Sequence, residues 1–587
     1  MTAEEKTDAL ARAAARFRGA HKSRIAAVAA GLAAALLLAL IALTGSGYTL
    51  QFSTDILAAV TLAYGWNLIS GFTGYLSFGQ VSFYGIGAYA TSILVLRAGM
   101  PWYFAVCCAG LLGALAALVL GPIMLRLRGI LFALGMLGLA RILEVVFNNW
   151  NYAGASLGLS LPPALTPVSV YAGMALLALL GFLLNAFFAH SGFGLDAMSL
   201  NEDETAAVAL GVPATRVKVI AFALSALLPA AAGGLVAWNR SYLDPSSAFD
   251  PTLDLETIVF VLFGGVGTLW GPLFGATVLM LVAEEFLVYL PHFELALYGL
   301  VVIATVLAFP GGIVGIFNRF GYLRRPIILA PAILPAGEPP QKRPPRADEA
   351  PVLEVKDLEV RFEGLTALDG VSLALKRGET VAIIGANGAG KTTLFNTIAG
   401  FVPPSRGEIR FFGRDVTRLP TFRRAQLGMA RSFQIPRSMP MLSVWENVVL
   451  PARHGKERQR AVEHTAWVLH VSGLAPMWRD RAGRLPPGHQ RQLEFARVLA
   501  LAPEIAFLDE VMAGMTVEER EVVRAAIRRL PEFGVAAVVL VEHVISAVAD
   551  LADRMVVLDF GRKIAEDTPQ RVLRDPAVVR AYLGEPR

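Results

Sequence analysis

Residues 381–393 read Val-Ala-Ile-Ile-Gly-Ala-Asn-Gly-Ala-Gly-Lys-Thr-Thr, and this stretch decides the fold of the C-terminal part of the chain. Its apolar start predicts a buried strand, the following residues fit the phosphate-loop pattern G-x-x-x-x-G-K-S/T, and Leu394–Ala399 continues as a helix. In such a loop, glycines let backbone amides surround a phosphate, the lysine reaches the terminal phosphates and the following threonine can ligate magnesium. We therefore expect a nucleotide site that includes Gly385, Asn387, Gly388, Gly390, Lys391, Thr392 and Thr393.

Two further apolar strands end in residues that suit phosphate chemistry. Glu504–Leu508 is followed by Asp509 and Glu510. A carboxylate beside a phosphate loop suits magnesium, and a second one can polarise an attacking water, although two acids after a strand are more often a solvated cap. Ala537–Val541 is followed by Glu542 and His543, which repeats the same topology. We expect Asp509 at the metal, Glu510 and His543 as catalytic residues, and a purely structural histidine as the alternative for His543.

The composition divides the chain near residue 326. Of its 587 residues 55% are hydrophobic and 17% charged, against about 25% charged in an ordinary soluble domain. Apolar segments before residue 326, most of them long enough to cross a membrane core of about 30 Å, are Ile25–Thr44, Ile56–Ser70, Val81–Leu96, Trp102–Leu125, Ile130–Trp150, Val168–His190, Val217–Ala237, Thr257–Leu290 and Leu295–Phe309. Apolar runs after it shrink to strand length.

The predicted fold class is multi-domain, with a polytopic α-helical membrane domain followed by an α/β P-loop ATPase domain. We expect a cytoplasmic N-terminal segment at 1–24, the transmembrane domain at 25–325 and the ATPase domain at 351–587. Residues 326–350 between them are rich in proline and predict a semi-rigid, extended linker.

Positive charges orient the predicted spans, because cytoplasmic flanks carry an excess of lysine and arginine. Such residues precede the first span (Lys6 to Arg24), follow the fourth (Arg126 and Arg128) and follow the last (Arg319 to Arg325). Residues 257–290 must then either cross twice, turning at Gly264–Gly267, or re-enter and return, so eight or ten crossings are allowed. The apolar length of the first span favours an uncleaved helix over a signal peptide.

The C-terminal domain resembles the ATPase domain of ABC transporters over residues 351–587. The resemblance rests on the order of the phosphate loop, Ser432-Phe433-Gln434, Arg484–Arg497, Leu508-Asp509-Glu510 and His543. It implies that Gln434 contacts magnesium, that Phe362 stacks on adenine, that Glu510 is the general base and that His543 senses the γ-phosphate. A strand-core aromatic is the alternative for Phe362, and an ordinary loop amide is the alternative for Gln434.

The family signature before a helix departs from its usual Leu-Ser-Gly-Gly-Gln form, since it reads Leu485-Pro486-Pro487-Gly488-His489. By the resemblance, Pro486, Gly488 and His489 complete the nucleotide site of a partner domain, but without the serine hydroxyl. The Ala513-Gly514-Met515 sequence and Leu558–Glu566 are similar to the ATPases of branched-chain amino-acid importers. These matches favour an importer.

The membrane half resembles the permease subunits of the same importers over residues 50–316. The resemblance rests on glycine-rich stretches at Asn67–Tyr89 and Gly264–Gly275, where closely spaced glycines suit either a broken helix lining a cavity or close helix packing. Asn201–Val212 is similar to the coupling helix that inserts into the ATPase, with an unpartnered amphipathic helix as the alternative. Arg141 and Glu144 lie three apart and can pair inside the bundle, either as a structural pair or on the substrate path.

The resemblance implies an ATP hydrolase coupled to uptake, namely a fused permease and ATPase of a branched-chain amino-acid-type ABC importer in a bacterial inner membrane, using ATP and Mg²⁺. It implies as partners a periplasmic binding protein, a small-molecule solute, the lipid bilayer, and either a second permease and ATPase or a second copy of the chain. Uptake of urea, short amides or aromatic acids, and a membrane-anchored ABC ATPase that exports or senses, remain open. The net charge of +5 gives no reason to expect nucleic acid as a partner.

Overall fold

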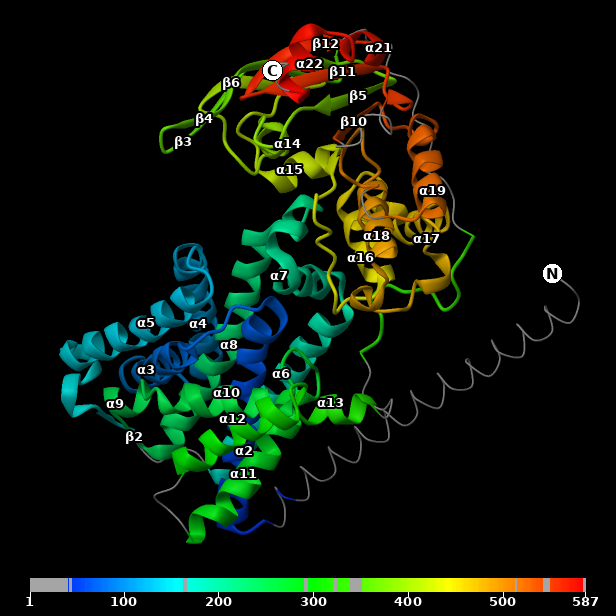
Figure 1. Cartoon of the computed structure of the whole chain (residues 1–587). Coiled ribbons are helices and arrows are strands. Elements are labelled where there is room, and N and C mark those ends of the chain that lie inside the picture. Colours follow the sequence, from blue (N-terminus) through cyan, green and yellow to red (C-terminus); the bar gives the residue numbers. More distant parts are fainter. Residues whose placement is uncertain are drawn as a thin grey trace, which may run out of the picture. The chain divides into compact units, whose positions relative to one another are not determined.

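The computed structural model describes residues 41, 45–161, 166–289, 294–319, 325–336, 351–512, 515–541 and 549–583 (Figure 1). Almost all of the first predicted span, and also His543, lie outside these residues. The chain forms two compact units. The helical unit takes residues 1–71, 75–186 and 219–323, and the second unit takes 72–74, 187–218 and 324–587. The second unit thus includes residues 187–218, which the sequence analysis assigned to the transmembrane domain at 25–325. The domain limits drawn from the sequence stay a prediction.

The helical unit consists of apolar helices joined by short connections. Their bounds are α2 Gly47–Trp66, the π-helix η1 Asn67–Gly71, α3 Gln80–Ala98, α4 Trp102–Met124, α5 Ile130–Asn149, α6 Pro167–His190, α8 Ala214–Arg240, α9 Pro245–Ala248, α10 Thr252–Gly264, α11 Gly271–Tyr289, α12 Glu294–Ala308 and α13 Gly312–Arg319. A two-residue strand, β1 Leu159–Ser160, pairs with β2 Tyr242–Leu243 in antiparallel register. This unit confirms the predicted polytopic helical class.

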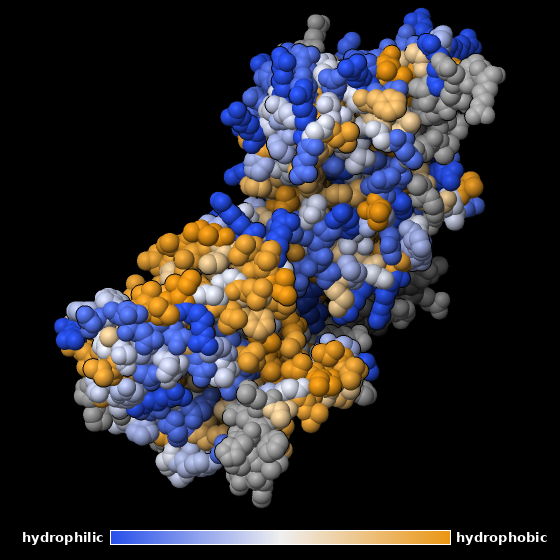
Figure 2. Space-filling view, turned by 60° about the vertical axis from the view of Figure 1, so that its left-hand side comes forward, coloured by the Kyte–Doolittle hydropathy of each residue, from blue (hydrophilic) through white to orange (hydrophobic). Residues whose placement is uncertain are grey.

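Six segments of the described residues are long and apolar enough to cross a membrane: Gln80–Ala98, Trp102–Met124, Ile130–Asn149, Pro167–His190, Ala214–Arg240 and Ala296–Arg319. Large apolar side chains on α4, among them Leu111, Leu115, Val119 and Ile123, are exposed at helical spacing. Figure 2 shows hydrophobic residues gathered over the surface of the helical unit, whereas the second unit is mostly hydrophilic on the face shown. Such an exposed apolar surface is expected where lipid chains replace water. The choice between eight and ten crossings stays a prediction.

A helix break, one of the two alternatives for the first glycine-rich stretch, is present between α2 and α3. The chain passes through η1 and two further helical residues, is irregular from Gly74 to Gly79 and enters α3 at Gln80. Polar groups released by the break are paired locally: Trp66 Nε1 donates to the Ser77 carbonyl at 2.8 Å, and Ser70 Oγ donates to the Tyr75 carbonyl at 3.0 Å. A non-helical segment inside an apolar bundle is tolerated only with such pairing.

The two glycine-rich stretches meet at Asn67. Its side-chain amide donates to Asn185 Oδ1 at 2.8 Å and to the Thr268 carbonyl at 3.0 Å, and its oxygen accepts from the Gly267 backbone at 2.8 Å. The π-helix, α6 and the connection between α10 and α11 are therefore tied together at a fully buried amide.

Residues 257–290 form most of a helical hairpin. α10 ends at Gly264, the chain turns through Gly265 and Gly267 in left-handed conformations, and α11 returns so that Gly275 packs against the Phe260 carbonyl. The turn lies where the sequence predicted it. With 13 residues, α10 is about 20 Å long and is too short to cross a 30 Å core alone.

One prediction for the helical unit is wrong. Arg141 and Glu144 do form an ion pair on α5, but the side chain of Arg141 is 56% exposed, so the pair does not lie inside the bundle. Its exposure on an apolar helix places it on the outer surface of the unit.

The second unit is built on two sheets, which confirms the predicted α/β P-loop class. The larger sheet has the order β12-β11-β5-β10-β9-β8, in which β11, β5, β10, β9 and β8 run parallel and β12 is antiparallel. Their bounds are β12 Arg562–Asp567, β11 Arg554–Asp559, β5 Glu379–Ile384, β10 Ala537–Val541, β9 Ile505–Asp509 and β8 Met429–Arg431. The smaller antiparallel sheet has the order β4-β3-β6-β7, from β4 Leu365–Leu375, β3 Leu353–Phe362, β6 Arg406–Phe411 and β7 Arg414–Asp415.

Helices of the second unit carry the residues of interest. They include α7 Gly192–Ala209, α14 Lys391–Ala399, α15 Thr421–Leu427, α16 Val444–His454, α17 Ala461–Val471, α18 Pro487–Ala500, α19 Val517–Arg528, α21 Pro569–Val572 and α22 Pro576–Leu583. The central strands β5, β9 and β10 are almost wholly buried and apolar, as expected for parallel strands covered on both faces. Their carboxyl ends therefore meet at one edge, where ligands bind in open α/β sheets.

Candidate functional site

The phosphate loop connects the end of β5 to the start of α14 at Lys391. Gly388 and Gly390 have φ of +84° and +101°, and a side chain at Gly390 would meet the Ala367 carbonyl at 2.8 Å, so only glycine fits there. Lys391 Nζ donates to the carbonyls of Gly385 and Ala386 at 2.6 and 2.9 Å. The loop backbone thus surrounds the lysine ammonium at a helix N-terminus, a position that suits phosphate.

The side chains around this loop set its charge. Burial lowers the pKa of Lys391, and the negative charges of Glu510 and Asp509 act in the opposite direction. Asp509 ends β9 and is buried, with its backbone amide donating to Ser432 Oγ at 2.7 Å. The sheet therefore places both predicted acids at the phosphate-loop edge.

Glu510 has a constrained backbone. It is a non-glycine residue at φ +48°, which costs about 1–2 kcal/mol, and its amide donates to the Val541 carbonyl of β10 at 2.9 Å. The side chain of Gln434 donates to Glu510 Oε1 at 2.9 Å. The predicted magnesium ligand and the predicted general base are thus in direct contact.

Arg491 of α18 was not singled out by the sequence, although it bridges the same two loops. Its Nη1 donates to the Gln434 carbonyl at 2.6 Å and to the Glu510 carbonyl at 3.1 Å. The signature that precedes it begins α18: Pro486 is the N-cap residue, without a side-chain cap hydrogen bond, and Gly488 and His489 lie in the first turn. Arg491 therefore joins the signature helix to Gln434 and Glu510.

The remaining predicted site residues differ in their exposure. Asn387 and Thr392 are exposed, and Thr393 is half-buried. Phe362 ends β3 and is 45% exposed, so the alternative of a strand-core aromatic does not hold, while stacking on adenine stays a prediction. The position of His543 lies outside the described residues, and its role also stays a prediction.

Residues 187–218 pack on the ATPase part of the second unit through α7. This helix is interrupted at Asp203, whose backbone has φ −156° and ψ 103°, and Asp203 Oδ1 caps the following turn by accepting from the Ala206 amide at 2.9 Å. The predicted coupling segment is therefore a short helical turn after a break, which begins at Asp203 and not at Asn201.

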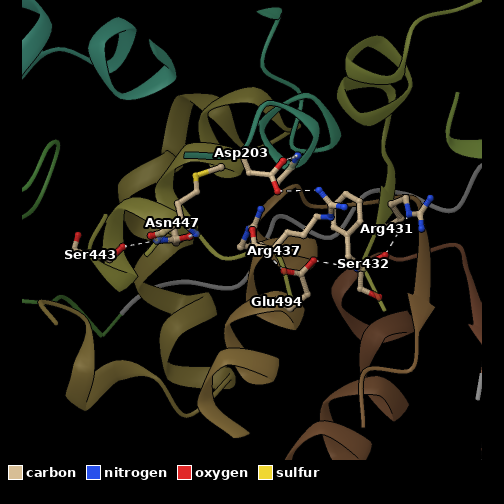
Figure 3. A network of polar contacts seen from close by, with 11 residues as sticks. Asp203, Arg431, Ser432, Arg437, Ser443, Asn447 and Glu494 are labelled. Carbon is tan, nitrogen blue, oxygen red and sulfur yellow. Dashed lines mark hydrogen bonds and ion pairs between the residues drawn. The ribbon is translucent and has the colours of Figure 1, made fainter. Parts of the chain in front are cut away.

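Ion pairs hold this segment against α16 and the loop before it. Asp196 Oδ1 accepts from Arg453 Nη1 and contacts His454 Nε2, each at 2.9 Å. Arg437 lies 3.0 Å from Asp203 (Figure 3). At the far end of the segment, the Gly211 carbonyl accepts from Gln426 Nε2 of α15 at 2.8 Å. The alternative of an unpartnered amphipathic helix is therefore wrong.

A continuous run of hydrogen bonds leads from the coupling segment towards Asp509. Arg497 Nη1 donates to the Arg437 carbonyl at 2.5 Å and pairs with Glu494 at 3.0 Å. Glu494 Oε1 accepts from the Phe433 amide at 3.1 Å, close to Ser432 (Figure 3). The Ser432 hydroxyl in turn accepts from the Asp509 amide. Opposite charges three apart on α18 were the only sequence signal of this pair. Both residues are buried.

Comparisons with known proteins agree for both parts of the chain. Family profiles match residues 48–306, described as "Branched-chain amino acid transport system / permease component", residues 368–513, described as "ABC transporter", and residues 562–587, described as "Branched-chain amino acid ATP-binding cassette transporter".

Curated relatives match the ATPase part over nearly their full length. The high-affinity branched-chain amino acid transport ATP-binding protein BraF of Pseudomonas aeruginosa is 36% identical over 252 residues, which cover 40% of this chain and 98% of that protein. The corresponding LivG protein of Escherichia coli is 34% identical with the same coverage. A solved nucleotide-free ATP-binding cassette from an ABC transporter is 27% identical, covering 40% of this chain and 100% of its own, with a TM-score of 0.37.

The profiles place a permease domain and a nucleotide-binding ATPase domain in one polypeptide, and the relatives are covered almost completely by the second of these. The phosphate loop, the paired acids and the docked coupling segment agree with that assignment. The chain is thus a membrane protein of the branched-chain amino acid ABC transporter family, with its permease fused to its transporter ATPase.

Proposed function

We propose that the protein takes up branched-chain or related amino acids across a bacterial inner membrane, with its ATPase domain in the cytoplasm. The observation that carries this proposal is the docking of residues 187–218 on the ATPase, through Asp196 with Arg453 and Asp203 with Arg437. A permease loop held by ion pairs to the ATPase can transmit nucleotide-driven movement to the membrane. The relatives named for branched-chain amino acid transport support the solute class.

The ATPase site supports a division of roles among its residues. Phosphates would lie against Gly385, Asn387, Gly388, Gly390, Lys391 and Thr393, and Phe362 would stack on the adenine. Thr392, Gln434 and Asp509 would hold Mg²⁺, which supplies charge neutralisation of the phosphates. Glu510 would accept a proton from the attacking water, and the contact with Gln434 keeps its carboxylate beside the metal ligand.

One chain provides half of the machinery that its family resemblance implies. The signature at Pro486, Gly488 and His489 would complete the nucleotide site of a second ATPase, so a second copy or a separate permease and ATPase would be needed. A periplasmic binding protein would deliver the solute and make the first selection.

Uptake of labelled leucine tests the proposal directly. Cells of the source bacterium that lack the chromosomal gene should recover ATP-dependent leucine uptake when the gene is returned, and should not recover it with Glu510→Gln. The Glu510→Gln protein should still bind ATP, because the phosphate loop is intact. Recovery of urea or benzoate uptake without leucine uptake would contradict the amino-acid assignment, and leucine efflux would contradict import.

A further inference from the structure

A group of buried polar side chains lies where α3 begins. The N-cap residue Gly79 makes no side-chain cap, and a carboxylate from another helix takes its place: Asp254 Oδ1, in the first turn of α10, accepts from the Val81 amide at 3.1 Å. Asp254 is 2% exposed and Gln80, the first residue of α3, is 1% exposed. The helix N-terminus and this carboxylate are therefore buried together within the helical unit.

The pairing of these groups is incomplete. Within the part of the chain that the structure describes, Asp254 Oδ2 and both side-chain amide atoms of Gln80 have no hydrogen-bond partner. The hydroxyls of Ser77 and Ser82, which are also buried, share this property. Unpaired buried polar atoms are rare and each needs an explanation, and in a membrane domain such groups mark solute or ion pathways. Asp254 is oriented by its bond to α3, so its second oxygen has a fixed direction.

The chemistry of the unpaired atoms selects among solutes. The carboxylate of Asp254 is stable as an anion in an apolar bundle only beside a cationic donor, since a neutral donor leaves its charge uncompensated. The side-chain amide of Gln80 adds an NH₂ group with two N–H donors and a carbonyl acceptor. An α-amino acid carries an ammonium group and a carboxylate on neighbouring atoms, which match Asp254 Oδ2 and the Gln80 amide nitrogen. Urea and short amides carry no cation.

The N-terminus of α3, where these polar atoms lie, directly follows the helix break. Half-helix ends next to irregular backbone are where transporters contact polar solutes. Beyond Gln80, α3 packs closely through glycines, since a side chain at Gly85 would overlap Phe249 and one at Gly87 would overlap the Ala230 carbonyl. The polar atoms are therefore enclosed in this conformation, and α3 must move relative to α8 and α10 for a solute to reach them.

We propose that Asp254 and Gln80 form the contact site in the permease for the ammonium and carboxylate groups of an amino-acid solute. This inference rests on the proposed function and specifies where in the membrane domain the solute is recognised. It makes the α3 N-terminus a selective element in addition to the external binding protein.

Two variants test the site with little change in shape. Asp254→Asn keeps an oxygen that can cap the Val81 amide and removes only the charge, and Gln80→Met keeps the volume of the side chain and removes both polar atoms. Asp250→Asn is the matched control, because Asp250 caps the nearby Thr252 amide at 2.9 Å and belongs to the same segment. The complete complex is reconstituted in vesicles with saturating binding protein, and leucine transported per ATP hydrolysed is measured with basal ATPase activity.

Asp254→Asn and Gln80→Met should each lower the amount of leucine transported per ATP about ten-fold or more. This is the loss expected when one charge-assisted hydrogen bond is removed. Basal ATPase activity should stay within about two-fold of that of the unaltered protein. Asp250→Asn should transport normally. Normal leucine transport by both site variants would overturn the inference alone. Absence of leucine transport by the unaltered complex would overturn both the proposed function and the inference.

Discussion

The guanidinium of Arg437 lies 3.0 Å from a carboxylate oxygen of Asp203, and the backbone carbonyl of the same arginine accepts a hydrogen bond from Arg497. Arg437 therefore belongs to two structures at once, the docked coupling segment and the buried pair Glu494–Arg497 that reaches the Gln434 loop. Because Asp203 also caps the short coupling turn, this one residue fixes both the place and the start of that turn.

Reversing this ion pair should impair coupling without unfolding the protein. The side chain of Arg437 is 45% exposed, so the pair stabilises the fold by less than about 1 kcal/mol. We expect Arg437→Glu to lower solute-stimulated ATPase activity and uptake several-fold, because the negative charge of the glutamate repels Asp203. Basal ATPase activity should stay close to normal. Combining it with Asp203→Arg should restore part of the loss, because the ion pair forms again with its charges exchanged, although the carboxylate that caps the Ala206 amide is lost.

The control for the charge reversal is Arg528→Glu, at an exposed position of α19 away from the coupling segment. A double variant no better than Arg437→Glu alone would show that the ion pair does not carry the coupling.

A side chain at Gly211 should separate ATP binding from transport. Gly211 has φ +92°, and a side-chain carbon there would approach His454 to 2.9 Å, beside the bond from Gln426 to the Gly211 carbonyl. Gly211→Val should therefore displace the end of the coupling segment and abolish uptake, with ATP affinity unchanged because the substitution leaves the residues of the phosphate loop intact. Full uptake with full ATP turnover in this variant would contradict the assignment of the segment.

The sequence predicted much of the ATPase site because its residues follow strands in order. The apolar runs at Val381–Ile384 and Ala537–Val541 became adjacent parallel strands β5 and β10, so residues at their ends had to meet at one edge. The same logic could not find Arg491 or the Glu494–Arg497 pair. These residues lie on a helix face whose neighbours are loops, and no local pattern shows which loop a helix will meet. Asp254 was missed for a similar reason, since its partner on α3 is distant in sequence.

Uptake should be preserved when residues are added to the linker beyond Ala336, whereas the contacts of residues 325–336 with the ATPase should be needed for stability. Residues 325–336 are held to the ATPase, with Arg325 Nη2 2.8 Å from buried Glu446 and Arg479 donating to the Ala332 carbonyl at 2.7 Å. Inserting several Gly/Ser residues at Pro339–Pro345, outside the described residues, should preserve most uptake because force passes through docked contacts. A stepwise loss of uptake with each inserted residue would indicate a mechanically coupled linker.

Arg325→Ala should instead destabilise the ATPase by about 1–3 kcal/mol, because it removes a charged partner from the Glu446 carboxylate. Thermal unfolding of the full-length protein measures this change, and Arg325→Lys, which keeps the charge, should recover part of it.

The ATPase unit should lose stability between pH 6.5 and about pH 4 because of His464. Burial lowers the pKa of His464 from 6.5 to about 4, and its ring contacts the Leu499 carbonyl and stacks on Trp467. Between pH 6.5 and about pH 4, His464 binds a proton in the unfolded state but not in the folded state. The contribution of His464 to the free energy of unfolding is therefore complete above pH 6.5 and is lost as the pH falls. The size is about 3 kcal/mol.

Thermal unfolding of the full-length protein at several pH values checks the His464 prediction. The unfolding temperature should fall more steeply with acidification in the unaltered protein than in His464→Gln, which has no group that titrates in this range. Parallel pH profiles for the two proteins would exclude His464 as the cause.

Pro486→Ser should raise both the stability of α18 and the rate of ATP turnover, for separate reasons. Pro486 is the N-cap residue with φ −56° and ψ 154°, close to the φ −69° and ψ 163° of the capping residue Ser443. A serine hydroxyl can therefore cap α18 and add about 0.5–2 kcal/mol of stability. In the closed pair of ATPases, the same hydroxyl would bond the γ-phosphate of the partner site. One charge-assisted hydrogen bond is worth about 1.5–3 kcal/mol, or about ten- to a hundred-fold in occupancy of the closed state.

Pro486→Ala separates the effect of the hydroxyl from the removal of the proline ring, and Glu510→Gln shows which site turns over. In a homodimer, both sites lack the hydroxyl and turnover of the unaltered protein should be slow throughout. In a heteromer, Glu510→Gln in this chain should remove most ATPase activity and the matching change in the partner little, because the signature of this chain completes only the partner's site. Equal losses would contradict that asymmetry. If Pro486→Ala raises turnover as much as Pro486→Ser, the missing hydroxyl does not limit the reaction.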